Sequence, residues 1–415
     1  MPYLYQVKRN QSLLIIGKVW PEPNSSAAGT RMMQLIAFYK SQGYKITFVS
    51  TAKTSEFQVD LNAINIETST IELNSGSFDE YIKGLNPNVV IFDRFMTEEQ
   101  FGWRVIENCP KAIRILNTED LHFLRRSRYE SVKKVGDLSE VELKTDDAIR
   151  EIASIYRCDL TLLVSKVEME LLKSEFQIPE SILFHLPVFP NDVIKNAPTF
   201  NEREGFLFIG NFYHEPNWDA LRFLKQTVWP LIRRKLPSAE LNVYGAYPSQ
   251  KVYDFHNSKE GFLIHGRAEN AIEVTLENRV SLAPLRFGAG IKGKLLEAMV
   301  AGTPSITTSI GAEGMASPDE WPGSVVDDPD LFAEAACSVY TDEVLWNQSQ
   351  LKGYTVLENH FESDGFFKRF EMKLSAMESR LDEFRSAYFI QQLVKHQSIM
   401  SNRYLSKWIE QKNKA

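Results

Sequence analysis

The stretch RVSLAPLRFGAGIKGKLLEAMVAGTPSITTS, residues 279–309, contains a complete strand–helix–strand unit. Residues 279–285 and 304–309 have the character of short buried strands. The helix between them is expected to begin near Gly290–Lys292 and to end at Ala301, because Gly302 and Pro304 follow as a strong stop signal. This order predicts two strands of one parallel sheet, joined by a helix that crosses over the sheet.

The same rhythm of short apolar runs and helical stretches extends over most of the chain. The runs barely alternate between apolar and polar residues, which is typical of a parallel sheet covered on both faces. The rhythm pauses at residues 185–205, where three prolines accompany little periodicity. Further strands are predicted at residues 12–20, 45–50, 88–93, 112–117 and 160–165 before this pause, and at 206–211, 240–245, 261–266 and 323–328 after it.

The predicted fold class is therefore α/β, with two doubly wound Rossmann-like domains that face each other across a cleft. We expect an N-terminal domain at residues 1–185, a linker at 186–204, a C-terminal domain at 205–355 and a helical segment at 356–415. Ligands of such sheets bind outside the carboxyl ends of the strands.

The tail carries apolar residues at helical spacing, namely Leu374, Met377, Leu381, Phe384 and Tyr388. The plain interpretation is a helix that packs one stripe onto the body, partly returning to the N-terminal domain. Residues 386–415 hold five Lys or Arg and one acidic residue, together with four aromatic side chains. A second interpretation of this segment is peripheral contact with an anionic membrane surface.

Composition bounds the function. The 415-residue chain has a net charge of −7, which argues against general affinity for nucleic acid. Its three cysteines lie far apart, as in a reduced cytoplasmic protein, and no metal-binding pair is evident. No apolar run approaches the roughly 20 residues of a membrane span. We therefore expect a cytoplasmic protein, either free or resting on a membrane surface, that needs no metal and no cofactor.

The opening stretch also combines features of an anion site. Gly288 and Gly290 allow a ligand close to the backbone, and a helix N-terminus follows with unpaired N–H groups. Arg286 and Lys292 add positive charge, and Glu297 can accept hydrogen bonds from ribose hydroxyls. The pattern predicts a site for a nucleoside diphosphate. The alternative is structural: turn glycines, a solvated arginine and an ordinary surface pair of Lys294 with Glu297.

Four other groups are candidates. Gly29 and Arg31 follow a turn that could cradle an anion or simply start a helix. Asn211 and Asn217, with His214 between them, border the first loop of the second domain, where they could contact a donor or cap a helix. Asp93 ends a strand and could bind an acceptor hydroxyl or pair with Arg94 or Arg125. The Asp-Pro-Asp at 328–330 is interpreted as a helix N-cap and not as a metal ligand.

His122 lies in the first turn of a helix for which Asn117 or Thr118 is the expected cap. The positive end of the helix dipole favours a neutral imidazole there. The residue either packs beneath the 117–130 segment or faces the ligand.

Several segments resemble one known family. Residues 286–315, with their Arg-x-Gly-x-Gly-x-Lys run and LLEAMVAGTPSITTSIGAEGM, are similar to the donor-binding segment of GT-B-fold glycosyltransferases of family 4. Residues 208–224, 21–32, 117–128 and 160–172 follow the order expected of that family. The chain departs from its Glu-x7-Glu motif, since Ala289 stands where the first glutamate is common. The usual Arg and Lys after the first strand of the second domain are also missing.

The resemblance implies a GT-B architecture and transfer of a hexosyl group from a nucleotide-diphosphate sugar, with retention of configuration, in polysaccharide biosynthesis. It implies a glycan or lipid-linked glycan as acceptor, and it assigns His122 to the donor sugar and Gly29 to the donor diphosphate. Arg286 and Lys292 would stabilise the departing diphosphate. An epimerase or phosphorylase on the same fold, or a non-catalytic scaffold, are the alternatives that remain.

Overall fold

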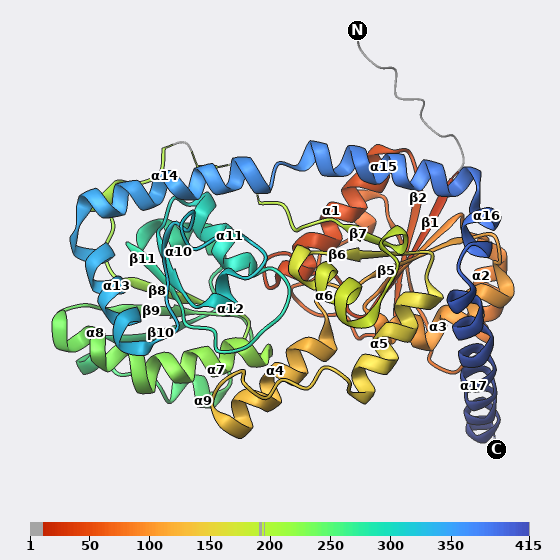
Figure 1. The fold of residues 1–415 in the computed structure, drawn as a ribbon, viewed down its shortest axis with the longest axis horizontal. Helices are drawn as coiled ribbons and strands as arrows, with labels where there is room; N and C mark the ends of the chain where they lie inside the picture. Colours follow the sequence, from red (N-terminus) through yellow and green to blue (C-terminus); the bar gives the residue numbers. More distant parts are fainter. Residues whose placement is uncertain (1–10, 191–192, 195, 415) are drawn as a thin grey trace, which may run out of the picture.

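The computed structural model describes residues 11–190, 193–194 and 196–414, and it contains two parallel sheets, each covered by helices. Figure 1 shows the two α/β domains side by side, with the chain passing from red through yellow in the N-terminal domain to green and cyan in the C-terminal domain. The predicted two-domain α/β class is confirmed.

The N-terminal sheet has the strand order β3-β2-β1-β4-β5-β6-β7, and every neighbouring pair is parallel. Its strands are β1 (Ser12–Gly17), β2 (Lys45–Ser50), β3 (Glu67–Thr70), β4 (Val89–Asp93), β5 (Ile113–Asn117), β6 (Leu160–Leu163) and β7 (Leu183–His185). Its helices are α1 (Ala27–Ser41), α2 (Ser77–Leu85), α3 (Phe95–Asn108), α4 (His122–Val135), α5 (Asp146–Arg157) and α6 (Lys166–Phe176).

The C-terminal sheet has the order β10-β9-β8-β11-β12-β13, again parallel. Its strands are β8 (Phe206–Ile209), β9 (Leu241–Tyr244), β10 (Phe262–Gly266), β11 (Val280–Ala283), β12 (Ser305–Thr307) and β13 (Gly323–Val325). Its helices are α7 (Glu215–Phe223), α8 (Trp229–Lys235), α9 (Gln250–Tyr253), α10 (Ala271–Glu277), α11 (Gly293–Val300), α12 (Ser309–Ala312) and α13 (Pro329–Thr341).

In both sheets the order in which successive strands are added reverses near the centre. The reversal lies between β1 and β4 in the first sheet and between β8 and β11 in the second. Such points are where open α/β sheets bind ligands, at the carboxyl ends of the strands. The loops that leave β1 and β11 therefore occupy the two favoured positions, and the opening stretch supplies the second of them.

Two strands escaped prediction. β3 has the polar sequence ETST and is partly exposed at an edge, so it lacks the apolar run of its neighbours. β7 has three residues and lies at the start of the proline-rich segment. Both are edge strands, where burial on two faces is not required.

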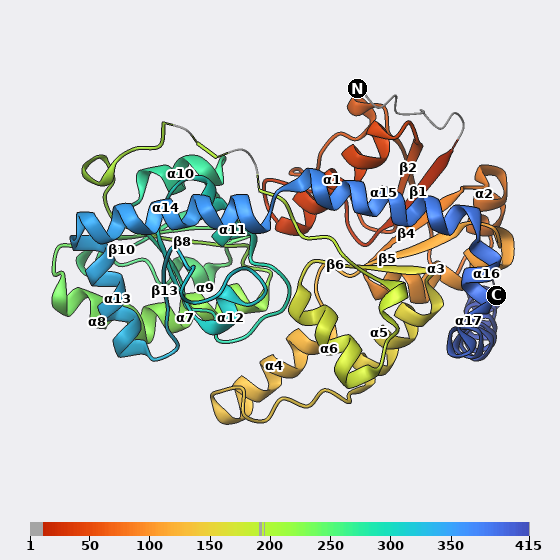
Figure 2. The same ribbon diagram turned by 45° about the horizontal axis from the view of Figure 1, so that its top comes forward.

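The last helices run back across the molecule. α14 (Glu343–His360) lies on the C-terminal domain and α15 (Ser363–Ser379) continues onto the N-terminal domain, as Figure 2 shows in blue. Phe370, Leu374 and Met377 of α15 are buried in the same apolar cluster as Leu13 and Ile15 of β1. The predicted apolar stripe of the tail is therefore part of a core.

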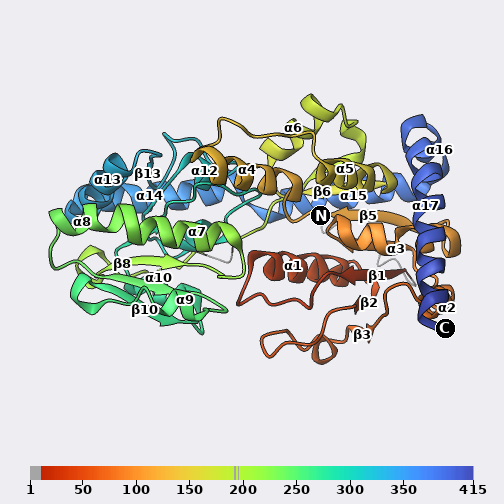
Figure 3. The same cartoon turned by 90° about the horizontal axis from the view of Figure 1, so that it is seen from below.

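α16 (Leu381–Ser386) and α17 (Phe389–Lys414) follow at the end of the N-terminal domain that lies away from the C-terminal domain, as Figures 1 and 3 show. α17 packs on α3 and α5, where Gln391 donates to the Cys158 carbonyl at 2.9 Å and Ser406 accepts from Arg104 at 3.1 Å. Among the described residues, no helix combines the length and the apolar character that a bilayer span requires.

Candidate functional site

The starts of two helices from different domains meet at the carboxyl ends of β1 and β11. α1 begins at Ala27 after residues 21–26, here called the N-terminal bend, and α11 begins at Gly293 after residues 286–292, the glycine bend. A β-carbon built on Gly293 would lie 2.7 Å from Cβ of Ala27. Each helix start carries a partial positive charge, so the point where they meet favours an anion.

The glycine bend rests directly on the N-terminal domain. Gly290 has a φ of +65°, and a β-carbon there would approach Cβ of Asp120 to 2.9 Å, so glycine is required on both counts. Its N–H donates to Oε1 of Glu168 at 2.7 Å. At Gly288 a β-carbon would meet only ordinary contacts at 3.7 Å, and the carbonyl there accepts from Arg128.

Ala289 belongs to the apolar cluster of the N-terminal domain that includes Leu121 and Leu124. This contact gives a physical reason for the missing glutamate of the family motif. A carboxylate at this position would be buried in apolar surroundings, which is costly without a partner.

Two lysines at the start of α11 are withdrawn from water. Lys292 is 8% exposed, and its Nζ donates to the Gly290 carbonyl at 2.8 Å. Burial lowers the pKa of Lys292 to about 8, against the opposing effect of Glu313. Lys294 is half-buried and donates to Oδ1 of Asn217 at 2.7 Å, and burial lowers its pKa to about 7. Both ammonium groups would gain from an anionic ligand.

Glu297 lies one turn further along α11 and is half-buried. Burial raises its pKa to about 7, while the nearby Lys294 acts in the opposite direction. The alternative of an ordinary surface pair with Lys294 does not describe this environment. Lys294 was not among the predicted site residues, although it stands between Lys292 and Glu297 in the sequence.

Arg286 is engaged elsewhere in this structure. Its guanidinium forms a two-pronged ion pair with Asp219 of α7, with Nε 2.8 Å from Oδ2, and it lies over the ring of Phe223. Asp219 lies 67 residues earlier in the chain and gave no local signal. Arg286 could contact a phosphate only by giving up or sharing this carboxylate, so its catalytic role stays a prediction.

Asn211 and Asn217 form a series of hydrogen bonds that links the N-terminal bend to α11. Nδ2 of Asn211 donates to the Ser25 carbonyl in the N-terminal bend at 3.3 Å. Nδ2 of Asn217 donates to the Asn211 carbonyl at 2.9 Å, and its Oδ1 accepts from Lys294. These contacts bring both residues to the site where the helix starts meet.

Gly29 and Arg31 of α1 have structural partners. The N–H of Gly29 donates to Oγ of the cap residue Ser26 at 3.1 Å, and a β-carbon would lie 2.4 Å from the Glu22 backbone. Arg31 is 1% exposed and donates to the carbonyls of Leu186 and Pro187, where the linker begins. Its contacts therefore join α1 to the linker, and no described contact joins it to α11.

His122 begins α4, but the expected cap is wrong. Leu121 occupies the cap position without a side-chain bond, because Asn117 accepts from Arg31 and Thr118 donates to the Leu162 carbonyl. Nδ1 of His122 lies 3.4 Å from Oδ1 of Asp120 and 3.7 Å from Oε1 of Glu151. The side chain is 17% exposed, so it sits beside carboxylates with limited access.

Of the two alternatives for Asp93, the ion pair with Arg94 or Arg125 is not formed among the described residues, and the contact with an acceptor hydroxyl stays a prediction. Arg125 pairs with Asp120 instead, and Oδ2 of Asp93 accepts from the N–H of Lys18 at 3.1 Å. Asp328 caps α13 through the N–H groups of Asp330 and Leu331, as expected.

Three carboxylate contacts, none of them predicted, hold the two domains together. Glu22 accepts from the Tyr247 hydroxyl at 2.8 Å, and Arg128 forms a two-pronged pair with Glu313 at 2.7 and 2.8 Å. The third is the contact of Glu168 with Gly290. All involve residues far apart in the sequence, so only the fold reveals them. Across the described residues, no group of three His, Cys, Asp or Glu side chains is arranged to hold a metal ion.

Comparison with known proteins supports the fold. Residues 203–342 match the family model described as glycosyl transferases group 1. A sucrose-phosphate synthase from Thermosynechococcus elongatus covers 89% of this chain and 100% of its own length, with a TM-score of 0.69 at 15% identity. A mutant of TarM from S. aureus, solved with fondaparinux, α-GlcNAc-glycerol and UDP, covers 71% of this chain with a TM-score of 0.57 at 11% identity. This chain spans 57% of the length of that TarM chain.

Among curated proteins, an uncharacterised 44.6 kDa protein in the cps region of Klebsiella pneumoniae is 21% identical over 290 residues. The match covers 66% of this chain and 72% of that protein. The chain has the GT-B fold that the sequence predicted.

Proposed function

We propose, from a GT-B fold whose second domain matches glycosyl transferases group 1, that the protein transfers a glycosyl group from a nucleotide-diphosphate sugar to a hydroxyl acceptor. The observation that carries this proposal is the meeting of two helix starts beside Lys292 and Lys294. Two positive helix ends and two partly desolvated ammonium groups suit a diphosphate that gains charge as it departs.

The roles within the donor site follow from these positions. Lys292, Lys294 and the first N–H groups of α11 would hold the diphosphate, with Gly288 and Gly290 shaping the bend around it. Glu297 would accept hydrogen bonds from the ribose, for which its ionised form is needed. Asn211 and Asn217 would fix the orientation of Lys294 and the contact with the N-terminal bend. Gly29 would contribute through the positive start of α1.

For the transfer step we propose retention of configuration, with the acceptor attacking from the face that the diphosphate leaves. The departing phosphate can accept the acceptor proton, so no protein base is required. Arg286 would join the diphosphate by sharing Asp219, and His122 would contact the donor sugar from the N-terminal domain. Arg31 would act indirectly, through the position of α1. Closure of the two domains would exclude water from the donor.

UDP is the first nucleotide to test, since it is present in the TarM structure. Calorimetric titration with UDP, GDP and ADP should give heat with at least one of them, and at ~100 times the dissociation constant the ligand should add ~2.7 kcal/mol to the free energy of unfolding. No binding of any nucleotide would favour a scaffold. Release of free nucleoside diphosphate only in the presence of acceptor would separate a transferase from an epimerase.

For the acceptor we propose a glycan or lipid-linked glycan, with polysaccharide biosynthesis as the setting. The curated relative from a cps region is consistent with that setting. The anomeric configuration of the product, read by NMR, decides between retention and inversion. An inverted product would overturn the proposed mechanism while leaving the donor site intact.

We also propose that α17 rests on an anionic membrane surface. Large apolar side chains lie exposed along it, including Phe389, Tyr404 and Trp408 at 73%, 63% and 61% exposure. Phe389, Leu393, Met400, Tyr404 and Trp408 recur at spacings of four and seven residues, so they form one stripe. Lys407 and Lys412 accompany this stripe, and aromatic and basic side chains together are typical of interfacial helices.

Co-sedimentation with phosphatidylglycerol vesicles tests the membrane contact. Binding should weaken in the double variant Tyr404→Ser, Trp408→Ser and should be absent with purely zwitterionic vesicles. Light scattering in solution tests the alternative, in which the stripe pairs with a second copy of the chain. A concentration-dependent dimer that the same double variant abolishes would mean that the stripe pairs with a second copy of the chain.

A further inference from the structure

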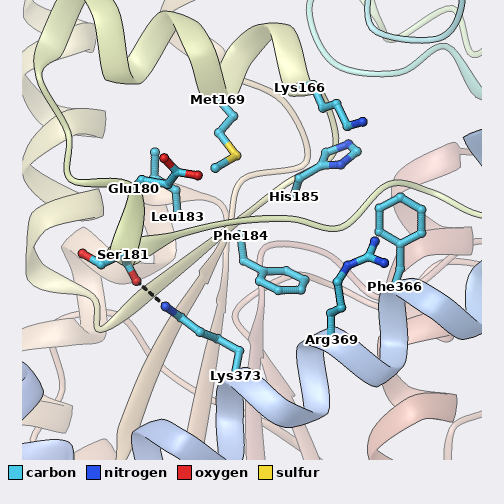
Figure 4. Close-up of a pocket in the computed structure, with 10 residues that line it drawn as sticks. All are labelled: Lys166, Met169, Glu180, Ser181, Leu183, Phe184, His185, Phe366, Arg369 and Lys373. Atoms are coloured by element: carbon cyan, nitrogen blue, oxygen red, sulfur yellow. Dashed lines mark hydrogen bonds between the residues drawn. The ribbon is translucent and has the colours of Figure 1, made fainter.

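A cavity of about 450 Å³ lies between α6 and α15, over the edge strand β7. Figure 4 shows Met169 and Lys166 descending from α6, Phe184 and His185 on β7, and Phe366, Arg369 and Lys373 rising from α15. Nothing in the donor site described above touches this cavity. It combines an apolar floor with several cationic groups.

The positive charge in the cavity is not balanced by its acids. Glu180 is 3.2 Å from Lys173 and is therefore already paired. Within the described part of the chain, neither Lys166 nor Arg369 takes part in an ion pair. Arg369 is exposed, and its Cζ lies 4.5 Å from the centroid of the Phe366 ring. Stacking on an aromatic face leaves the N–H groups of an arginine able to bond a ligand.

A second cavity of about 310 Å³ adjoins the first and shares Lys166, His185, Phe366 and Arg369 with it. It extends to Gly314 and Met315 of the C-terminal domain. Its own carboxylate, Glu362, accepts from the N–H groups of Asp364 and Gly365 at the start of α15. Glu362 keeps its negative charge and offsets part of the positive charge near Arg369, with which it forms no ion pair in the described structure. The shared residues mark the point where both cavities meet.

The start of α6 lies at the same point. Lys166 is its first residue, and Ser165 at the cap position forms no side-chain bond to the helix. Ser165 is 1% exposed and lines neither cavity, so it is Lys166 that brings the start of α6 to them. A helix start without a side-chain cap leaves N–H groups that an anion can satisfy.

We propose that Lys166 and Arg369, on either side of His185, form a second anion site, which binds the phosphoryl group of a ligand whose less polar body lies on Phe184 and Phe366. Arginine and lysine flanking a helix start match the oxygens of a phosphoryl group. The ligand is either a soluble phosphorylated sugar or the head group of a lipid phosphate. The site is independent of the donor site and does not rest on glycosyl transfer.

His185 offers a direct reporter of occupancy. Its Nε2–H donates to the Val164 carbonyl at 3.2 Å, so the ring lies beside the proposed anion without donating to it. Burial lowers its pKa to about 4 against the effect of this bond, and Lys166 and Arg369 contribute to the lowering. A bound phosphoryl dianion would oppose these effects, so the pKa of His185 should rise. The imidazole resonances, assigned with His185→Gln, can be followed by NMR during titration of the full chain with inorganic phosphate and with glycerol 3-phosphate.

The expected result is a saturable shift of the His185 resonance that is weakened at least tenfold by Arg369→Met and by Lys166→Met. The matched control is Lys368→Met, which removes an exposed charge next to Arg369 without touching the cavity. The donor-site variant Lys292→Met should leave the shift unchanged. Melting temperatures of the variants establish that each of them folds.

The two sources of ligand are separated by a third arm with dihexanoyl phosphatidic acid. Tighter binding than glycerol 3-phosphate indicates a lipid, and equal binding indicates a soluble sugar phosphate. Absence of any saturable shift overturns the proposal. So does a shift that persists in the folded Arg369→Met and Lys166→Met variants, or one that Lys292→Met abolishes.

Discussion

The two bends that meet at the candidate site differ in what they contribute. The N-terminal bend, PEPNSS, contains one acid and no base, and its serine and carbonyl groups are used to cap α1 and to contact Asn211. The glycine bend contains Arg286 and Lys292 and is followed by Lys294. Both present a helix start to the same point, but only one adds full positive charges. The difference teaches that both domains supply a helix dipole, through α1 and α11. The charged side chains are concentrated in the C-terminal domain.

The strongest test of this asymmetry removes the two lysine charges at the start of α11. Lys292→Met and Lys294→Met keep similar volume, and each should weaken nucleoside diphosphate binding about 10- to 100-fold, the range expected for a hydrogen bond to a charged group. Calorimetry of the free and mutant proteins measures the loss. Lys235→Met, which removes an exposed ion pair with Glu334 on the same domain, serves as control. Unchanged affinity in both lysine variants would place the diphosphate elsewhere.

A second test varies the same charges through pH. The pKa of Lys292 is lowered to about 8 and that of Lys294 to about 7, and the anion binds their protonated forms. Affinity should therefore fall as the pH rises from about 8 to 10, by at most roughly tenfold per unit for each proton taken up on binding. Below this interval the ionisation of Glu297, whose pKa is about 7, acts in the opposite direction. Titrations in buffers of different ionisation enthalpy would detect that proton. An affinity that rises over this interval would contradict the assignment.

A third test concerns the contact of the glycine bend with the N-terminal domain. Gly290→Ala places a β-carbon at positive φ and close to Asp120, so it should lower the free energy of unfolding by about 1–2 kcal/mol. Gly288→Ala meets no such obstacle and should stay within about 0.5 kcal/mol of the wild type. Urea unfolding followed by tryptophan fluorescence compares the two. Equal losses would mean that neither the positive φ nor the approach to Asp120 distinguishes Gly290 from Gly288 in solution.

The smallest effect is expected on the N-terminal side. Tyr247→Phe removes the hydrogen bonds from the hydroxyl to Glu22 that link the domains. The free energy of domain closure should become less favourable by about 0.5–1.5 kcal/mol. Small-angle scattering would register a larger radius of gyration in the variant without ligand. Diphosphate affinity should change by less than in the lysine variants. A larger loss here than at Lys292 would reverse the comparison of the two bends.

Much of the fold was within reach of the sequence. Buried parallel strands need apolar residues on both faces, so runs such as residues 45–50 stand out, whereas the edge strand β3 is polar enough to resemble a loop. Helix ends marked by glycine and proline were also predicted, as at Gly302, because glycine readily adopts the positive φ that follows a helix. The class and the two-domain order followed from these local signals.

The site was less accessible to prediction. A bend rich in glycine and lysine before a helix is a local pattern, which is why residues 286–297 stood out. The partners that decide what these residues do come from distant parts of the chain: Asp219 for Arg286, Asn217 for Lys294 and Glu168 for Gly290. Nothing in the sequence near Arg31 indicated that its guanidinium is directed to the carbonyls of the linker.

The return of α15 to the first sheet has a consequence for folding during synthesis. Phe370, Leu374 and Met377 complete an apolar cluster whose other buried members come from the first 190 residues. At translation rates of 5–20 residues per second, roughly 10–40 s pass between the synthesis of β7, the last strand of the first domain, and the arrival of this helix, and about twice as long for β1. During that interval the surface destined for α15 is exposed, so a nascent chain stalled before residue 370 should engage chaperones, and a fragment ending at residue 185 should aggregate when expressed alone.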